Sequence, residues 1–269
     1  MRVCRGSCQL PLGKRRLPLQ SALFFLAVAA TTHAEWSVLS SNSEPGHAGI
    51  LHRHVLVEDA GAGERAVIDL AIFSGNAFTL RAIDQPSEPR VDLADAMVRQ
   101  HCLAGVNGGY FDPDYAPIGL LIVDGKMIAP LQRARLLTGV LTAGPRGVQI
   151  LRVSEFSRKQ KFNAAIECGP FLVDIGQRVR GLETTRLARR TFAAAATDGH
   201  FALGFCSDVT LADLAKILAV QLAPDFTIYR ALNLDGGSSS AFWFARKDGS
   251  VFSIPEQKTV RDFVAVLSR

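Results

Sequence analysis

The chain has 269 residues, with 30 Lys and Arg against 25 Asp and Glu, which gives a formal net charge of +5. The excess of positive charge comes from residues 1–34, which carry five of the basic residues and none of the acidic ones. Residues 35–269 therefore hold 25 of each and contain no block of Lys and Arg interleaved with aromatic residues. This balance argues against nucleic-acid binding.

Residues 1–34 have the organisation of an export signal. A basic segment precedes an apolar stretch at residues 17–30, and Thr32-His33-Ala34 supplies the small residues of a cleavage site. The stretch is shorter than the roughly 20 apolar residues of a membrane span. We therefore expect a signal peptide at 1–34, a periplasmic or secreted protein that begins at Glu35, and no stable membrane span after cleavage. An uncleaved membrane anchor is the alternative.

Residues 35–269 are expected to form one domain, because no linker rich in Pro, Ser or Gly interrupts them and their length allows a sizeable core. Three cysteines lie in this part, Cys102, Cys168 and Cys206. In an oxidising compartment they allow one disulfide and one free thiol. Their apolar surroundings equally suit three buried thiols.

Short apolar stretches separated by turn signals recur along the chain and predict strands. The predicted strands span residues 55–58, 66–73, 103–106, 118–123, 148–153, 162–166, 171–174, 191–196, 201–205, 228–234, 241–244 and 263–267. Tight turns that contain Asp-Gly predict three hairpins. These turns are Asp124-Gly125-Lys126, Asp198-Gly199-His200 and Lys247-Asp248-Gly249-Ser250.

Two segments predict helices. Thr210-Leu211-Ala212-Asp213 resembles a capping box, leucines then recur at helical spacing as far as Leu222, and Pro224 closes the segment. Residues 92–100 are a shorter candidate. Many strands and few helices predict an α+β fold, namely a single domain of mostly antiparallel or mixed β-sheet with one or two flanking helices.

Two glycine-rich turns, far apart in the sequence, each follow a predicted strand. The first is Asn107-Gly108-Gly109-Tyr110-Phe111 and the second is Asp235-Gly236-Gly237-Ser238-Ser239-Ser240. Glycine allows positive φ and the close approach of a ligand, and successive free N–H groups form a nest for an anion. We expect both turns to meet around one polar ligand that is phosphorylated or sugar-like.

Other polar residues at strand ends have two interpretations each. Glu167 precedes the sharp Gly169-Pro170 turn, and is either a solvated strand-end acid or a carboxyl group facing the cleft. Arg190 opens a strand, and is either a surface charge or a planar donor for a phosphate. The serines after Gly237 do not form the Gly-x-Ser-x-Gly elbow of an α/β-hydrolase, nor does a P-loop lysine follow them.

Metal ligands are sparse in the sequence. His52-Arg53-His54 places two imidazoles on one face of a strand, but no partner lies nearby in sequence, which argues against a structural zinc site. A divalent cation held by Asp235 and backbone oxygens is compatible with the pattern. The metal and cofactor requirement is therefore unknown from the sequence.

Several blocks of the chain together resemble the phosphodiester glycosidase family, which includes the lysosomal uncovering enzyme that removes N-acetylglucosamine from a phosphodiester on mannose. The blocks, in the family's order, are residues 107–111, 167–170, 190–191 and 209–211 leading to 234–239. The resemblance runs from about residue 48 to residue 267 and looks closest to a bacterial branch with no assigned substrate. Three features depart from the family: Ser238 replaces a glycine, Glu167 lies where Gln is common, and the strand after Arg190-Thr191 lacks its glycine.

The resemblance implies an exported hydrolase that cleaves a sugar from a phosphodiester or related glycoside. It implies Asp235 as the catalytic carboxylate, Glu167 as the second candidate, Asn107 as the group that orients a hydroxyl or water, and Arg190 as the phosphate ligand. The alternative is a non-catalytic envelope protein that binds an anionic glycan. The expected partner is thus a sugar phosphodiester or an anionic glycan. The expected binding residues are Gly108, Gly109, Tyr110, Gly236, Gly237, Ser238, Ser239 and Thr191.

Overall fold

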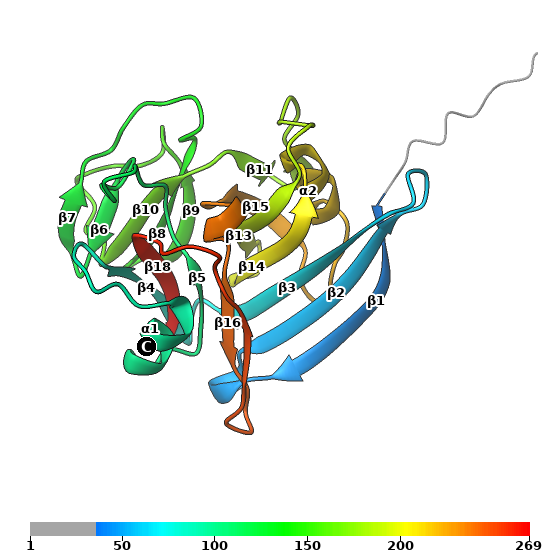
Figure 1. Ribbon diagram of the computed structural model, residues 1–269, viewed down its shortest axis with the longest axis horizontal. Coiled ribbons are helices and arrows are strands. Elements are labelled where there is room, and N and C mark those ends of the chain that lie inside the picture. The colour runs from blue at the N-terminus through cyan, green and yellow to red at the C-terminus, as the bar shows by residue number, and fades with distance from the viewer. Residues whose placement is uncertain (1–35) are drawn as a thin grey trace, which may run out of the picture. The chain divides into compact units, whose positions relative to one another are not determined.

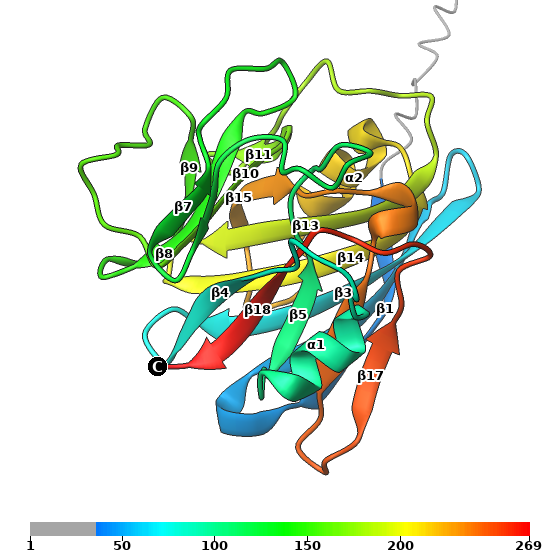
Figure 2. The ribbon, with the colours of Figure 1, turned by 60° about the vertical axis from the view of Figure 1, so that its left-hand side comes forward.

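The computed structural model describes residues 36–269, so the predicted signal peptide lies outside the described residues. This part of the chain contains 18 strands in three antiparallel sheets, two α-helices and two 3-10 helices (Figure 1, Figure 2). The predicted α+β class, with one domain dominated by antiparallel sheet, is confirmed. All three predicted hairpins are also present, at residues 121–129, 188–209 and 242–254.

The largest sheet has eight strands, and its blue and cyan N-terminal strands lie at the right of Figure 1. Its strands, in spatial order, are β1 (Trp36–Pro45), β2 (Leu51–Asp59), β3 (Glu64–Ser74), β14 (His200–Val209), β13 (Ala188–Ala196), β15 (Ile228–Asn233), β11 (Phe171–Asp174) and β12 (Gln177–Arg178).

The other two sheets have five strands each. One is ordered β7 (Lys126–Ala129), β6 (Leu121–Val123), β10 (Ala164–Cys168), β8 (Gly139–Gly144) and β9 (Gly147–Arg152). The other is ordered β17 (Val251–Ile254), β16 (Phe242–Ala245), β5 (Ala104–Asn107), β18 (Asp262–Ser268) and β4 (Phe78–Asp84).

Both predicted helices form, α1 (Leu93–Arg99) and α2 (Leu211–Leu218). The Thr210 side chain caps α2 by accepting from Asp213 N at 3.1 Å, as the capping-box pattern predicts. The helix ends before Leu222, because the N–H of Ala219 turns to the carbonyl of Lys216 and tightens the last turn. Two 3-10 helices, η1 (His47–Gly49) and η2 (Gly237–Ser239), are also present. Within residues 36–269 no helix has the length and apolar character needed to cross a membrane.

The three sheets share one hydrophobic core. Its buried side chains include Phe73 from the large sheet, Ile166 from the second sheet and Val106 from the third. Helix α2 covers the other face of the large sheet, and α1 packs on the third sheet (Figure 2). Full burial of each large apolar side chain stabilises the fold by roughly 1.5–3 kcal/mol, so this shared core fixes the sheets against one another.

The three cysteines of the described chain are buried and unpaired, so the alternative of three buried thiols holds. Burial raises the pKa of Cys102 to about 11 and raises those of Cys168 and Cys206 as well. Thiols that remain protonated at neutral pH are poor nucleophiles. They serve here as small core residues.

The register of the sheets brings several strand ends to one region of the molecule. The end of β5 pairs with the start of β18, where Phe263 lies opposite Asn107. The end of β15 pairs with the middle of β13, where Asn233 lies opposite Phe192. The segments that leave β5 and β15 are the two glycine-rich turns, so the fold places them side by side.

Candidate active site

The two glycine-rich turns meet, as the sequence predicts. The N–H of Asp235 donates to the carbonyl of Gly108 at 3.1 Å. The side-chain amide of Asn107 donates to the carbonyl of Asp235 at 2.7 Å. Two hydrogen bonds between segments 128 residues apart therefore define the position of the Asp235 backbone.

The buried side chain of Asn107 connects three segments beneath the site. Its side-chain carbonyl accepts from the Thr191 hydroxyl at 2.7 Å and from the N–H of Ala241 at 3.1 Å. Asn107 and Thr191 are each 0% exposed. Buried polar groups need hydrogen-bond partners, and Asn107 and Thr191 are partners for one another. The structure thus places both predicted site residues in the framework beneath the open surface.

The first turn does not offer free amides. The N–H of Gly108 donates to the backbone carbonyl of Asp262 at 2.9 Å, and the N–H of Gly109 donates to its carboxylate Oδ1 at 2.9 Å. Neither glycine has positive φ. The expectation of an anion nest at Gly108 and Gly109 is therefore not met, because an aspartate of the chain itself occupies it.

The second turn is more open. Gly237 begins η2 with φ of +67°, and the N–H of Gly236 donates to Asp235 Oδ1 at 2.9 Å. Within residues 36–269 the N–H groups of Gly237 and Ser238 have no acceptor, as is usual for the first residues of a helix. Ser238 is half-buried, whereas Ser239 is 1% exposed and lies beneath the turn.

Asp235 lies half-buried where the two turns cross. Burial raises the pKa of its carboxyl above the ordinary value. The Ser239 hydroxyl, the Gly236 N–H and the charges of Lys258 and Arg186 oppose this rise. A partly desolvated carboxylate facing two cations can stabilise positive charge in a ligand or activate water.

Two cations lie at the rim of this carboxylate. Arg186 and Lys258 are exposed, and among the described residues neither forms an ion pair. One terminal nitrogen of Arg186 lies 4.0 Å from the position that a Cβ on Gly237 would take. The N–H of Lys258 reaches the carbonyl of Ser238 at 3.3 Å, and its ammonium lies 5.6 Å from the Phe111 ring centroid. The sequence analysis did not assign either residue to the site.

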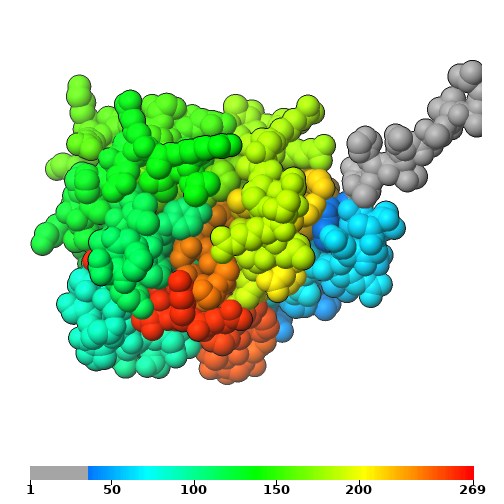
Figure 3. All heavy atoms as spheres, turned by 45° about the horizontal axis from the view of Figure 1, so that its top comes forward, coloured from blue at the N-terminus to red at the C-terminus, as the bar shows by residue number. Residues whose placement is uncertain are grey.

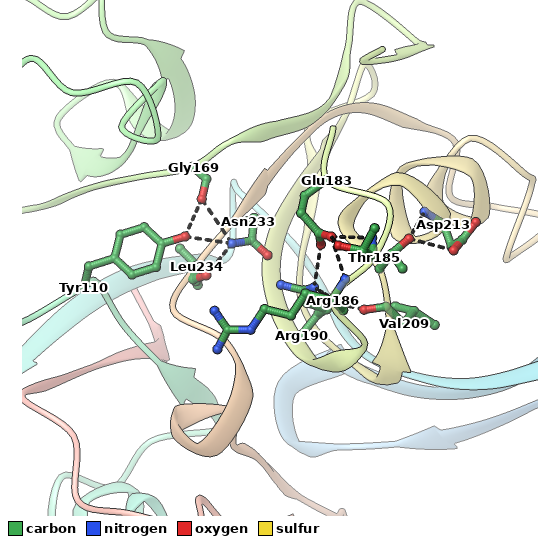
Figure 4. Close-up of polar contacts among 11 residues, drawn as sticks. Tyr110, Gly169, Glu183, Thr185, Arg186, Arg190, Val209, Asp213, Asn233 and Leu234 are labelled. Atoms are coloured by element: carbon green, nitrogen blue, oxygen red, sulfur yellow. Dashed lines mark hydrogen bonds and ion pairs between the residues drawn. The ribbon is translucent and has the colours of Figure 1, made fainter. Parts of the chain in front are cut away.

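Arg190, the predicted phosphate ligand, is mostly engaged by the framework (Figure 4). It is 7% exposed, and it donates to the carbonyls of Val209 at 3.0 Å and Arg186 at 2.7 Å. Burial lowers the pKa of its guanidinium. Its remaining nitrogen, Nη1, lies 3.8 Å from the position of a Cβ on Gly236. Arg190 therefore supports the segment that carries Arg186 and turns one nitrogen toward the second glycine turn.

The loop before Arg190 is ordered by one carboxylate. Glu183 Oε1 accepts from the N–H of Arg186 at 2.5 Å and from the Thr185 hydroxyl at 2.8 Å. Figure 4 shows these side chains gathered beside Arg190. The backbone position of Arg186 is thus fixed, while its side chain remains exposed.

Tyr110 forms a wall of the site with Asn233. The Tyr110 hydroxyl donates to the carbonyl of Gly169 at 2.5 Å, and the Asn233 side-chain amide donates to the Tyr110 oxygen at 3.0 Å (Figure 4). Burial raises the pKa of Tyr110 well above its ordinary value, so the hydroxyl stays protonated. Sequence reasoning missed Asn233, whose only signal is one polar residue within an apolar run.

Glu167 is neither a solvated acid nor a group on an open surface. It is 1% exposed, and its Oε2 accepts from the N–H groups of Leu120 at 2.8 Å and Gln132 at 2.9 Å. Its neighbours Ile166 and Cys168 face the shared core, so alternation along β10 directs Glu167 to the opposite face. The carboxylate anchors the loop that contains Leu120 and Gln132.

The two strand histidines have a common partner across the sheet. His52 Nε2 and His54 Nδ1 each lie 2.8 Å from Asp69 Oδ1, which belongs to the neighbouring strand. In residues 36–269 no group of three or more His, Cys, Asp or Glu side chains is arranged to hold a metal. A cation at Asp235 thus stays a prediction.

The site reaches the surface of the molecule. Figure 3 shows the orange segment that contains the second glycine turn between the green part of the chain and the yellow-green part, with the red C-terminal segment beside it. Three chain regions therefore border the segment that contains the second glycine turn on this face of the molecule.

The sequence of residues 100–267 matches the profile of the phosphodiester glycosidase family. The chain belongs to this family. The match contains both glycine-rich turns and every residue predicted for the site. The family suggests phosphodiester glycosidase activity, and its members act on sugar phosphodiesters. No curated protein matches the chain.

Solved structures show the same fold at low identity. The catalytic domain of zebrafish N-acetylglucosamine-1-phosphodiester alpha-N-acetylglucosaminidase, auto-inhibited by its pro-peptide, is 17% identical, with a TM-score of 0.61 over 86% of this chain and 88% of that one. A hypothetical protein from Synechocystis is 15% identical, with a TM-score of 0.59 over 82% and 62%. A protein from Burkholderia pseudomallei is 14% identical, with a TM-score of 0.55 over 76% and 74%. At these identities the likeness concerns the fold alone.

Proposed function

We propose that this phosphodiester glycosidase is an exported hydrolase that releases a sugar from a sugar phosphodiester. The observation that carries the proposal is the position of Asp235. Its carboxyl lies half-buried where the two glycine turns cross, with the cations Arg186 and Lys258 close enough to oppose the rise in its pKa that burial causes. This combination suits a ligand that carries both a sugar carbon to be attacked and a phosphate.

Hydrolysis at the anomeric carbon needs a carboxylate there. As the bond from this carbon to the phosphate oxygen breaks, its electron pair leaves with the phosphate and positive charge develops on the sugar. Ionised Asp235 stabilises that charge, the oxygen of a water molecule completes the bond to the carbon, and one of the water's protons passes to the departing phosphate. The products are the free sugar and a phosphomonoester. Because the phosphate is a good leaving group, the site needs no strong general acid.

The phosphate is assigned to the rim of the site. Arg186 offers a planar fork of donors that matches phosphate geometry, and Lys258 offers a mobile point charge. The N–H groups of Gly237 and Ser238 add donors on the same side of the turn. Arg190 was the phosphate ligand expected from the family resemblance. We assign it a supporting role, since its Nε and Nη2 already donate to backbone carbonyls.

Export follows from residues 1–34, whose pattern is that of a signal peptide. Expression of the full chain in a bacterial host, followed by mass measurement of the recovered protein, tests this part separately. Recovery from the periplasm with Glu35 as the first residue supports export. Recovery of the intact chain from the cytoplasm contradicts it.

The activity is tested with a panel of sugar 1-phosphodiesters, including UDP-N-acetylglucosamine, with and without EDTA. Free sugar should appear with the wild-type protein, and Asp235→Asn should lower turnover by about two to four orders of magnitude with an unchanged fold. The matched control is Asp225→Asn, a surface carboxylate that is 62% exposed and pairs with Arg53. Near-normal turnover in Asp235→Asn contradicts the assignment, and loss of turnover in EDTA establishes a metal.

A second outcome is informative. If no sugar is released but an anionic glycan binds with an affinity that Asp235→Asn leaves unchanged, the protein is a binder. Arg186→Ala should then weaken glycan binding, since the exposed guanidinium is one of the two free charges at the rim.

A further inference from the structure

Asp262 is a buried carboxyl group directly beneath the site. It is the first residue of β18 and is 2% exposed. Its backbone carbonyl accepts from the N–H of Gly108 and its Oδ1 accepts from the N–H of Gly109, both at 2.9 Å. One residue therefore holds both amides of the first glycine turn.

Gly108 is required by this carboxyl group. A Cβ on Gly108 would lie 1.9 Å from Asp262 Oδ1, although the φ of Gly108 is not positive. Residue 108 is therefore glycine because a side chain there would overlap the Asp262 carboxyl, and not because its backbone conformation requires glycine. Gly108 in turn accepts the N–H of Asp235 at 3.1 Å. Asp262 is connected to the catalytic aspartate through one residue.

The charges around Asp262 leave it poorly compensated. Arg261, the adjacent cation, donates to both oxygens of Asp84 at 2.6 Å and 3.0 Å and to the carbonyl of Tyr115 at 2.6 Å. Asp84 lies directly opposite Asp262 across the ladder with β4. Asp84 and Asp235 both oppose ionisation of Asp262, and Arg261 favours it. The remaining titratable neighbour is the thiol of Cys168, which is protonated at neutral pH.

We propose that Asp262 is a positioning residue that must be neutral for turnover, and that its ionisation suppresses the reaction at Asp235. The inference rests on the proposed function. Where both groups are ionised, their repulsion raises the free energy of the Asp235 carboxylate that the reaction needs. Ionised Asp262 also repels the phosphate of the substrate.

The pH range follows from the burial of Asp262. Desolvation raises the pKa of this carboxyl from 3.8 to about 7. The group is protonated below that pH and ionised above it. Asp235 has to ionise for activity, so activity rises with pH through the pKa of Asp235 and falls again above about pH 7.

The test compares the pH dependence of kcat/KM in the wild-type protein, Asp262→Asn and the surface control Asp225→Asn. Asparagine keeps an oxygen that accepts from Gly109 N and cannot ionise. We expect kcat/KM of the wild type and of the control to fall about tenfold per pH unit above about pH 7. The fall should be absent in Asp262→Asn. A fall of equal steepness in Asp262→Asn overturns the proposal while leaving the assigned hydrolase function intact.

A measurement that needs no turnover separates the two proposals. Carboxyl-carbon NMR of the protein labelled at aspartate follows each titration directly. Asp262 should titrate near pH 7, and its pKa should fall in Asp235→Asn, which removes a charge that opposes its ionisation, but not in Asp225→Asn. An Asp262 signal that titrates below about pH 5, or an Asp262 pKa unaffected by Asp235→Asn, overturns the inference even if the protein hydrolyses no substrate in the panel.

Discussion

The ionisation of Asp262 also makes a prediction about stability. Its folded-state pKa of about 7 exceeds the ordinary value of 3.8, so the folded protein retains a proton that the unfolded chain has lost between these two pH values. A group that binds more protons in the folded state lowers stability as pH rises. One pKa unit corresponds to about 1.4 kcal/mol, so ionisation of Asp262 in the unfolded chain, over the range where the folded protein keeps its proton, lowers the free energy of unfolding by about 4 kcal/mol at pH 8 relative to pH 3.

Asp262→Asn removes this loss. The variant and the wild type should have similar stability near pH 4, where the wild-type carboxyl is neutral, and the variant should be more stable by about 4 kcal/mol at pH 8. Urea unfolding of both proteins across this range measures the difference, and the contributions of other titratable groups cancel. A difference that does not change with pH refutes the argument. A variant that becomes relatively less stable as pH rises refutes its sign.

Three further substitutions test the framework of the site. Gly108→Ala should lower the free energy of unfolding by about 1–3 kcal/mol, because the new Cβ displaces the Asp262 carboxyl. Gly109→Ala is the matched control. A Cβ there would meet its nearest atom at 3.0 Å, so the free energy of unfolding should fall by less; urea unfolding measures both variants. Asn107→Ala should cost more than about 3 kcal/mol, because it leaves a hydroxyl, an N–H and a carbonyl without their partner, and calorimetry measures it. Glu167→Gln should retain turnover within about threefold, because the amide oxygen still accepts from Leu120 and Gln132; a loss of orders of magnitude would instead identify Glu167 as the catalytic carboxyl.

Strands with a strong local pattern were predictable. β3, β11 and β14 combine apolar residues with bounding turn signals, and the structure has them where the sequence places them. β1 was missed because Ser40-Ser41-Asn42-Ser43 carries no apolar alternation. It forms because its backbone pairs with β2 along most of its length at the edge of the large sheet. Pairing of this kind depends on the partner strand, which local sequence does not specify.

The crossing of the two turns was predictable, but the partners of their polar atoms were not. Asp235 could be singled out because a carboxylate, two glycines and three serines follow an apolar strand. The oxygen that accepts the Gly109 N–H belongs to Asp262, which lies 153 positions away in a segment with no local sign of function. The sequence likewise favoured Arg190 over Arg186 as the phosphate ligand, because it does not show which guanidinium is engaged by backbone carbonyls. The structure distinguishes the two, because the buried guanidinium of Arg190 already donates to two backbone carbonyls, whereas Arg186 is exposed.

Two departures from the family pattern have a structural reason. Ser238 replaces a glycine, and its φ is not positive, so the turn does not need glycine there. Phe192 lies in the strand that lacks the family's glycine, and its ring fills the space over Gly204 on the adjacent strand, where a Cβ would lie 2.3 Å from the ring. The glycine needed for close packing is thus on the partner strand.

These departures therefore preserve the framework and alter what a ligand meets. At the second turn the change replaces a hydrogen with the hydroxymethyl group of a half-buried serine, next to Asp235 and the backbone of Lys258. A hydroxyl both donates and accepts, so it can bind a sugar oxygen or a phosphate oxygen that glycine cannot. Substrate selectivity is the property we expect to differ from relatives that have glycine here. Ser238→Gly should accordingly change the ranking of substrates by kcat/KM while leaving the free energy of unfolding within about 1 kcal/mol of the wild type.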